Sequence, residues 1–485
     1  MPPSQRYRPS LAHAALGEAF YDIVEPAEFP NCVLRYRNQR WAARIGLGRL
    51  SEDEWLAAFG RFEPLPGSFP RPLALRYHGH QFRSYNPELG DGRGFLFAQA
   101  HDLLDGRLLD LGTKGSGRTP WSRFGDGRLT LKGGFREALA TEMLEAQGVD
   151  TSKTLSLVET GEALVRNDEP SPTRAAVLVR LSHSHIRIGT FQRLLYLDAH
   201  ADIERLLDYV VATYIPEAQR ENRSDRAAAF LEAVCRRVAR TGARWMAAGF
   251  VHGVLNTDNI NVTGESFDYG PWRWAPVLDP EFTAAYFDQT RLYAFGRQPD
   301  TLLWNLSRLA ECLLPLSAKP DLENALSVFE PTVRTEFAQA IVRRLGLKSA
   351  GPKEDGALAG ALWAFLESTR APFEQTFFDW RGGMLSEDRA QRSPSRALYE
   401  SDAFAPVRSA LRDHEASDPE GLAHPYFAQA APCTMLIEEV EALWAPIAAQ
   451  DDWAPFEAKL AAIQKMAEAY GDATAPVSED GSSEF

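Results

Sequence analysis

The sequence predicts an α+β fold of two lobes, and three observations support this prediction. Short apolar runs alternate with glycine-rich turns between about residues 73 and 187, which is typical of a strand-rich region. One amphipathic segment, Phe135–Gln147 (FREALATEMLEAQ), interrupts these runs and predicts a helix that ends at Gly148. From Asp202 onward, long amphipathic helical patterns predominate. A strand-rich lobe with one embedded helix therefore precedes a helical lobe.

The order of these elements divides the chain into four predicted parts. Residues 1–72 are punctuated by proline and are expected to form an N-terminal extension. Residues 73–190 are expected to form the strand-rich, nucleotide-binding lobe and residues 191–330 the helical lobe, which carries an early polar loop. Residues 331–485 are expected to form a helical C-terminal extension. This order is the outline of a protein-kinase-like two-lobed fold.

Composition and charge restrict the classes of function. The net charge of -14 and the pI of about 5.3 disfavour a broad nucleic-acid-binding face. No run of about 18 apolar residues is present and the first 20 residues lack a signal-peptide pattern, so we expect a cytoplasmic protein without a membrane span. Zinc chemistry is not expected, because no CxxC pair occurs among the cysteines at positions 32, 235, 312 and 433.

The tetrapeptide GDGR occurs twice, at residues 90–93 and at residues 125–128. In the first copy, Gly90 and Gly92 allow backbone amides to approach a ligand closely. Arg93 adds donors that suit phosphate oxygens. Two interpretations are open: a tight turn between strands, or a loop that holds a phosphate-bearing ligand.

A lysine and a glutamate have the spacing of a kinase phosphate site. Lys114 ends a predicted strand, and Glu137 lies 23 residues later in the first turn of the predicted helix. A strand lysine paired with a helix glutamate is how kinases orient the lysine toward nucleotide phosphates. Taken alone, Lys114 is better explained as a surface lysine, and its pairing with Glu137 is what favours the phosphate site.

The polar stretch GFVHGVLNTDNINVTGESFDYG supplies candidate metal ligands. Its His252 and Gly253 match the HGDLxxxN pattern of small-molecule kinases, and Asn259 follows the histidine by seven residues. Asn259 and Asp268 could hold Mg²⁺ through oxygen atoms, with nucleotide phosphates completing the coordination. His252 is interpreted as a structural residue that hydrogen-bonds the loop backbone.

The same stretch lacks the usual kinase base. Val254 occupies its position, and a valine cannot accept a proton. Asp258 is the nearby carboxylate that could replace it, with a loop-capping aspartate as the alternative. Arg180 and Arg187 would suit a terminal phosphate in a nucleotide cleft, with surface arginines as the alternative.

Four of these stretches resemble motifs of the selenoprotein O (SelO) family. The stretches are YHGHQFRSYNPELGDGRG, KGSGRTPWSRFGDGR, HGVLNTDN and FDYGP, in the order found in that family. The resemblance covers about residues 77–314. It implies a pseudokinase fold that binds ATP in a flipped orientation, so that AMP rather than phosphate is transferred to Ser, Thr or Tyr hydroxyls of proteins.

The resemblance also implies a role for each matched residue. Asp258 falls on the proton acceptor, Glu137 on the helix partner of the lysine, and Asn259 and Asp268 on the metal ligands. The matched nucleotide positions are Gly90, Gly92, Arg93, Lys114, Asp126, Gly127, Arg180, Arg187 and Asp268. A flipped nucleotide explains why no base is needed at Val254, since that position would face the wrong end of ATP. It also places the γ-phosphate where Arg180 and Arg187 can bind it. Since an aspartate beside phosphates is unfavourable, Asp126 is expected to meet the base or the ribose.

The sequence therefore predicts a monomeric, Mg²⁺-dependent protein adenylyltransferase that uses ATP and releases pyrophosphate, with Mn²⁺ as an alternative ion. Its expected partners are protein substrates, with neither nucleic acid nor membrane. Three alternatives stay open: a phosphotransferase with Asp258 as its base, a non-catalytic ATP-binding scaffold, and transfer of UMP in place of AMP.

Overall fold

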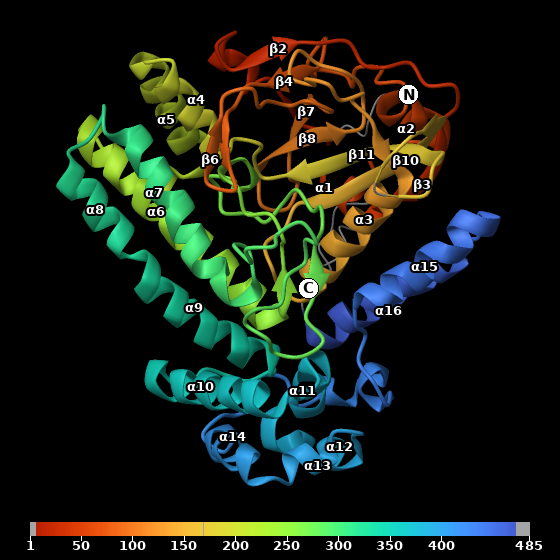
Figure 1. Cartoon of the computed structure of the whole chain (residues 1–485), viewed down its shortest axis with the longest axis vertical. Helices are drawn as coiled ribbons and strands as arrows, with labels where there is room; N and C mark the ends of the chain where they lie inside the picture. Colours follow the sequence, from red (N-terminus) through yellow and green to blue (C-terminus); the bar gives the residue numbers. More distant parts are fainter. Residues whose placement is uncertain (1–5, 168, 472–485) are drawn as a thin grey trace.

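An antiparallel sheet forms the upper part of the molecule (Figure 1). The structure is a computed structural model that describes residues 6–167 and 169–471. The strand order is β2-β4-β7-β8-β11-β10-β3. In addition, β1 pairs with β7 and β9 pairs with β11. The strands are β1 (Pro9–Ser10), β2 (Tyr21–Ile23), β3 (Val33–Arg37), β4 (Leu73–Leu75), β7 (Leu96–His101), β8 (Leu108–Lys114), β9 (Leu129–Thr130), β10 (Lys153–Leu164) and β11 (Thr173–Ser182). β1, β2 and β3 belong to the first 72 residues, so the segment predicted as an extension completes this sheet.

Both faces of the sheet are covered, and β11 shows how. Its odd-numbered residues Val177 and Val179 pack into a core with α2 (Glu52–Phe59), whereas Leu178 packs on the opposite face near α3 (Leu131–Ala146). Successive side chains of a strand alternate between faces, so Arg180 also points toward α3. This alternation decides which charged residues can meet at the site.

The predicted helix over residues 135–147 is present as α3, but it begins four residues earlier, at Leu131. The side chain of Thr130 accepts a hydrogen bond from the Gly133 amide and caps this helix. Gly133 and Gly134 argue against a helix by propensity. Tertiary packing overrides that preference, because a Cβ at Gly134 would lie 2.3 Å from Leu157 of the sheet.

Long helices form the second part of the molecule, as the amphipathic patterns predict. The longest, α6, begins at an Asn222 cap and ends at Gly249, whose left-handed backbone (φ 68°) terminates it. A short β12–β13 pair (Phe250–Val251 and Arg273–Trp274) follows. The helices are α4 (Ile188–Tyr196), α5 (His200–Tyr214), α6 (Arg223–Ala248), α7 (Gln298–Leu313), α8 (Lys319–Ser327) and α9 (Phe329–Arg344). None of the described helices combines the length and apolar composition that a bilayer crossing requires.

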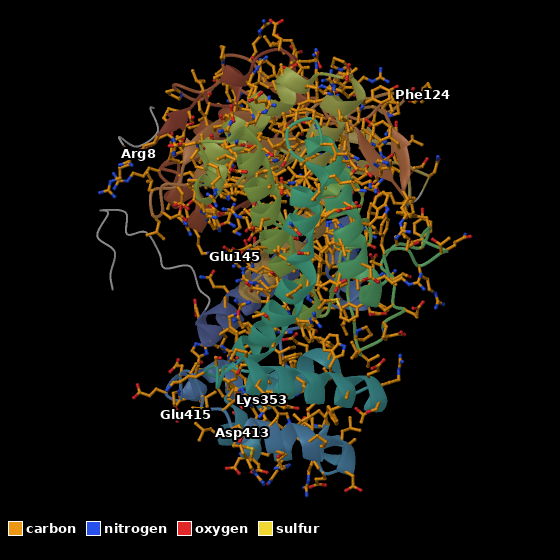
Figure 2. The ribbon with its side chains drawn as sticks, turned by 90° about the vertical axis from the view of Figure 1, so that its left-hand side faces the viewer. Arg8, Phe124, Glu145, Lys353, Asp413 and Glu415 are labelled. Carbon is orange, nitrogen blue, oxygen red and sulfur yellow. The ribbon has the colours of Figure 1, made fainter. Side chains whose placement is uncertain are left out.

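The C-terminal helices form two groups (Figure 1). The first group packs beneath α9 around a core that includes Trp380 and Phe404. Figure 2 shows Lys353, Asp413 and Glu415 in this lower part. Its helices are α10 (Pro352–Thr369), α11 (Phe373–Trp380), α12 (Glu387–Arg392), α13 (Arg396–Tyr399) and α14 (Ala405–Leu411). The second group, α15 (Ile437–Gln450) and α16 (Ala454–Tyr470), returns to α3, where the Phe135 ring lies 5.4 Å from Trp444 and 5.2 Å from Phe456.

Candidate nucleotide-binding and active site

A cavity of about 670 Å³ opens between the sheet and the helical part, a size that suits a nucleotide. The two GDGR loops, the ends of β8 and β11, and the short 3₁₀ turn η3 (Thr257–Asn259) all contribute to its walls. Glu137 lies outside this lining, buried on α3. The predicted site residues that line the cavity are Gly90, Gly92, Arg93, Lys114, Asp126, Gly127, Arg180, Arg187, Asp258, Asn259 and Asp268.

The first GDGR loop contacts Trp121 and Ser122, in the segment that leads into the second GDGR loop. The Ser122 hydroxyl donates a 2.5 Å hydrogen bond to the Gly92 carbonyl. A Cβ at Gly90 would lie 2.4 Å from the Trp121 ring, and a Cβ at Gly92 would lie 2.7 Å from the Trp121 carbonyl oxygen. Because Trp121 approaches so closely, both positions require glycine whether or not a ligand is bound.

The aspartates of the two loops have different partners. Asp91 is partly buried between the Leu75 amide, which donates at 3.1 Å, and the Arg187 guanidinium at 3.2 Å. Asp126 lies at the rim, where Arg166 donates two hydrogen bonds of 2.8 and 3.0 Å to its carboxylate. Burial would raise the pKa of Asp126, but these bonds hold it below its usual value. Asp126 is thus a fixed anion at the edge of the cavity.

The arginines of the two loops also differ. Arg128 donates from Nε to both carboxylate oxygens of Glu162 at 2.9 Å. Arg93 is exposed and has no ion-pair partner in the described part of the chain. The first loop therefore presents an arginine that can bind a ligand without first breaking an ion pair.

Lys114, Glu137, Arg180 and Asp268 form one cluster of charges on the wall of the cavity. The Lys114 ammonium donates to Glu137 at 2.7 Å and to Asp268 at 3.0 Å. Arg180 donates to the other Glu137 oxygen at 2.7 and 3.0 Å and to Asp268 at 3.0 Å. The strand lysine and the helix glutamate are thus paired. The predicted phosphate-binding Arg180 is already engaged by two carboxylates.

This cluster fixes the ionisation state of Asp268. Burial favours its neutral form, but Lys114 and Arg180 outweigh burial and hold the pKa of Asp268 well below its usual value. The backbone of Asp268 is left-handed (φ 66°), a costly conformation for any residue except glycine. His252 is buried, and its Nε2 lies 2.9 Å from the Phe267 carbonyl oxygen, so it anchors the residue before Asp268.

Two oxygen atoms on η3 are buried without hydrogen-bond partners in the described structure. One is Oδ1 of Asn259, whose amide nitrogen donates to Asp268 at 3.0 Å. The other is Oδ1 of Asp258. Burial raises the pKa of Asp258 to about 7, although Arg187 lowers it. Unpartnered buried oxygens are rare in proteins, and these two line one cavity, where they can accept a proton, a hydrogen bond or a cation.

Sequence reasoning missed several side chains that line the cavity, among them Tyr77, Arg123 and Arg166. Tyr77 lies beneath Arg187, whose guanidinium carbon is 4.1 Å from the ring centroid, and Arg166 holds Asp126. Arg123 is exposed on a left-handed turn (φ 52°) and has no ion-pair partner among the described residues. Arg123 could have been identified from the sequence, because it lies only three residues before the predicted site residue Asp126. Tyr77 and Arg166 reach the site only through tertiary structure.

Comparison with known proteins identifies the family. The sequence matches the family model described as Protein adenylyltransferase SelO over residues 4–464. Relatives named protein nucleotidyltransferase YdiU occur in Synechocystis sp., 44% identical over 477 residues (93% of this chain, 96% of that protein), and in Gloeobacter violaceus, 44% identical over 465 residues (94% of each). The Vibrio cholerae relative of that name is 39% identical over 364 residues (75% of this chain, 73% of that protein).

The chain is therefore a nucleotidyltransferase. It belongs to the SelO family of protein adenylyltransferases, which confirms the resemblance of its motifs to that family.

Proposed function

We propose that this enzyme transfers AMP from ATP to Ser, Thr or Tyr hydroxyls of proteins on a protein-kinase-like two-lobed fold. The observation that carries the proposal is the position of Asp258. Its buried carboxylate, whose Oδ1 has no hydrogen-bond partner among the described residues, lines the same cavity as Lys114 and Asp268. Val254, at the usual base position, can accept no proton. A pKa near 7 suits a general base at neutral pH.

The proposed transfer is an in-line displacement at the α-phosphorus. The acceptor oxygen forms a bond to this phosphorus, and the bond to the oxygen that bridges the α- and β-phosphates breaks. The hydroxyl proton passes to the Asp258 carboxylate, and pyrophosphate leaves. Lys114, Arg180 and Arg187 are all buried, at 7%, 5% and 6% exposure, and line the cavity with N–H donors that suit the β- and γ-phosphates of a flipped ATP. Their ion pairs with Glu137, Asp268 and Asp91 hold these donors in position.

The residues present fit a divalent cation such as Mg²⁺. Asn259 offers a buried amide oxygen without a hydrogen-bond partner in the described chain, and the ionised Asp268 carboxylate lies beside it. Within the described residues, no group of three or more His, Cys, Asp or Glu side chains could hold a metal, so phosphate oxygens would complete the coordination. When bound, the ion would neutralise charge on the phosphates.

The test is incubation of the enzyme and candidate acceptor proteins with α-labelled or γ-labelled ATP, followed by intact-mass analysis. We expect label from the α-position only and a mass increase of one AMP. Transfer of the γ-label would establish a phosphotransferase, and ATP binding without any transfer would establish a scaffold. Parallel incubation with UTP separates AMP from UMP transfer.

Two variants assign the base in this assay. Asp258→Asn keeps the side-chain shape and should lower the transfer rate by about 10²–10⁴-fold while ATP still binds. Asp279→Asn removes a carboxylate that does not line the cavity and pairs with Arg370 at 3.7 Å. It should retain wild-type transfer, and equal losses in both variants would contradict the role of Asp258.

A further inference from the structure

Three aromatic rings are exposed beside the Asp258 side of the cavity. Phe82 is 39% exposed, Phe287 is 45% exposed and Tyr286 is 80% exposed. The Phe82 ring lies 6.0 Å from Phe287, whose ring lies 5.2 Å from Tyr286. We name these three side chains the aromatic patch. Such a group of exposed rings is costly in water and marks an interaction site on many soluble proteins.

Hydrogen bonds connect the turn that carries Phe82 to Asn256 of the cavity lining. The Phe82 amide donates to Oδ1 of Asn256 at 3.0 Å, and the Tyr293 hydroxyl donates to the same oxygen at 2.6 Å. The Phe82 and Tyr293 rings are 5.0 Å apart. Asn256 lines the cavity and precedes Asp258 by two residues. Phe82 also directly follows Gln81, another residue of the cavity lining, so the patch lies next to the cavity.

The turn that carries Phe82 is strained. Phe82 and Arg83 link β5 (Gly79–Gln81) to β6 (Ser84–Asn86), and both have left-handed backbones with φ of 49° and 64°. A two-residue turn of this kind favours Asn-Gly, because bulky residues adopt positive φ at a cost. The presence of a large aromatic residue at this strained position is consistent with a function for its side chain.

We propose that the aromatic patch binds a large apolar side chain of the acceptor protein and thereby positions the neighbouring hydroxyl at Asp258. This inference rests on the proposed function. The occupant is a segment of the substrate protein, because the patch lies next to the cavity through Gln81 and Asn256 and the family acts on proteins.

The experiment uses nine-residue peptides with a fixed central Ser, Thr or Tyr and one large apolar residue placed at each other position in turn. Alanine fills the remaining positions, and all-alanine flanks give the reference rate. Burial of one large apolar side chain should raise kcat/KM for AMP transfer about tenfold at the preferred position. The double variant Tyr286→Ser, Phe287→Ser should reduce that preference to less than about twofold.

Matched controls remove exposed apolar side chains elsewhere. Leu104→Ser and Leu385→Ser alter residues that are 54% and 65% exposed and do not line the cavity, and both should retain the tenfold preference. Thermal unfolding of each variant checks that the fold is intact.

Different outcomes overturn the two proposals. Transfer by the wild type without apolar preference, or an unchanged preference in the double variant, would refute the docking role and leave the proposed function standing. Failure of the wild type to transfer AMP to any peptide or protein, although ATP binds, would refute both.

Discussion

Two aspartates ten residues apart line the same cavity in opposite electrostatic environments. Asp268 accepts hydrogen bonds from Lys114 and Arg180, and its pKa lies well below the usual value. Asp258 has no ion pair in the described structure, and burial raises its pKa to about 7. The two environments therefore make one carboxylate a permanent anion suited to a cation and the other a group that can take up a proton.

The largest expected effect is that of Asp268→Ala. The change removes a proposed metal ligand and leaves Lys114 and Arg180 with Glu137 as their remaining partner in the cluster. AMP transfer at saturating Mg²⁺ should fall by more than about 10³-fold. The free energy of unfolding should also fall, by about 1–3 kcal/mol, because a cation in a largely buried cluster loses its partner. Transfer within tenfold of wild type would refute the metal-ligand role.

The stability effect of Asp258→Asn should have the opposite sign. The pKa of Asp258 rises from 3.8 to about 7 on folding, so the folded state binds this proton more tightly. The stabilisation from this proton is present below about pH 4 and is lost as pH rises toward 7. Asparagine does not ionise, so the variant does not lose stability in this way as the pH rises. In protein free of nucleotide and divalent cations, the free energy of unfolding of Asp258→Asn at pH 8 should therefore exceed that of the wild type by about 2–4 kcal/mol.

Urea unfolding of both proteins at several pH values checks this expectation. The advantage of Asp258→Asn should grow between pH 4 and 7 and stay constant above pH 8. An advantage that does not change with pH would show that Asp258 is ionised throughout, and the contrast with Asp268 would then be wrong.

The sequence predicted the parts of this site that follow from local spacing. Lys114 and Glu137 lie 23 residues apart, as predicted, although Glu137 is in the second turn of α3 and not in its first. Asn259 and Asp268 lie in one polar segment. The sharing of Glu137 between Lys114 and Arg180 was not predictable. It depends on the register in which β8 and β11 pair, with Lys114 opposite Leu178 and Arg180 opposite Gly112. That register puts both cations on the α3 face.

The sequence predicted the central strands of the sheet more completely than the short strands near its edges. β1, β2 and β3 are two, three and five residues long, and most of their residues are only partly buried. Such strands carry no strong alternation of apolar and polar residues and form because they pair with β7, β4 and β10. An apolar pattern along the chain therefore identifies the central strands and misses the strands that complete the sheet.

The smallest expected effect applies the same comparison to the arginines of the two GDGR loops. Arg93 has no ion-pair partner within the described residues, whereas Arg128 pairs with Glu162 at 2.9 Å. Arg93→Ala should weaken ATP binding about tenfold, because a free guanidinium is lost from the phosphates, with little change in stability. Arg128→Ala should change ATP affinity less than about twofold but lower the free energy of unfolding by about 1 kcal/mol. ATP titration and urea unfolding of both variants measure the two effects. If Arg128→Ala weakened ATP binding as much as Arg93→Ala, the different roles proposed for the arginines of the two loops would be wrong.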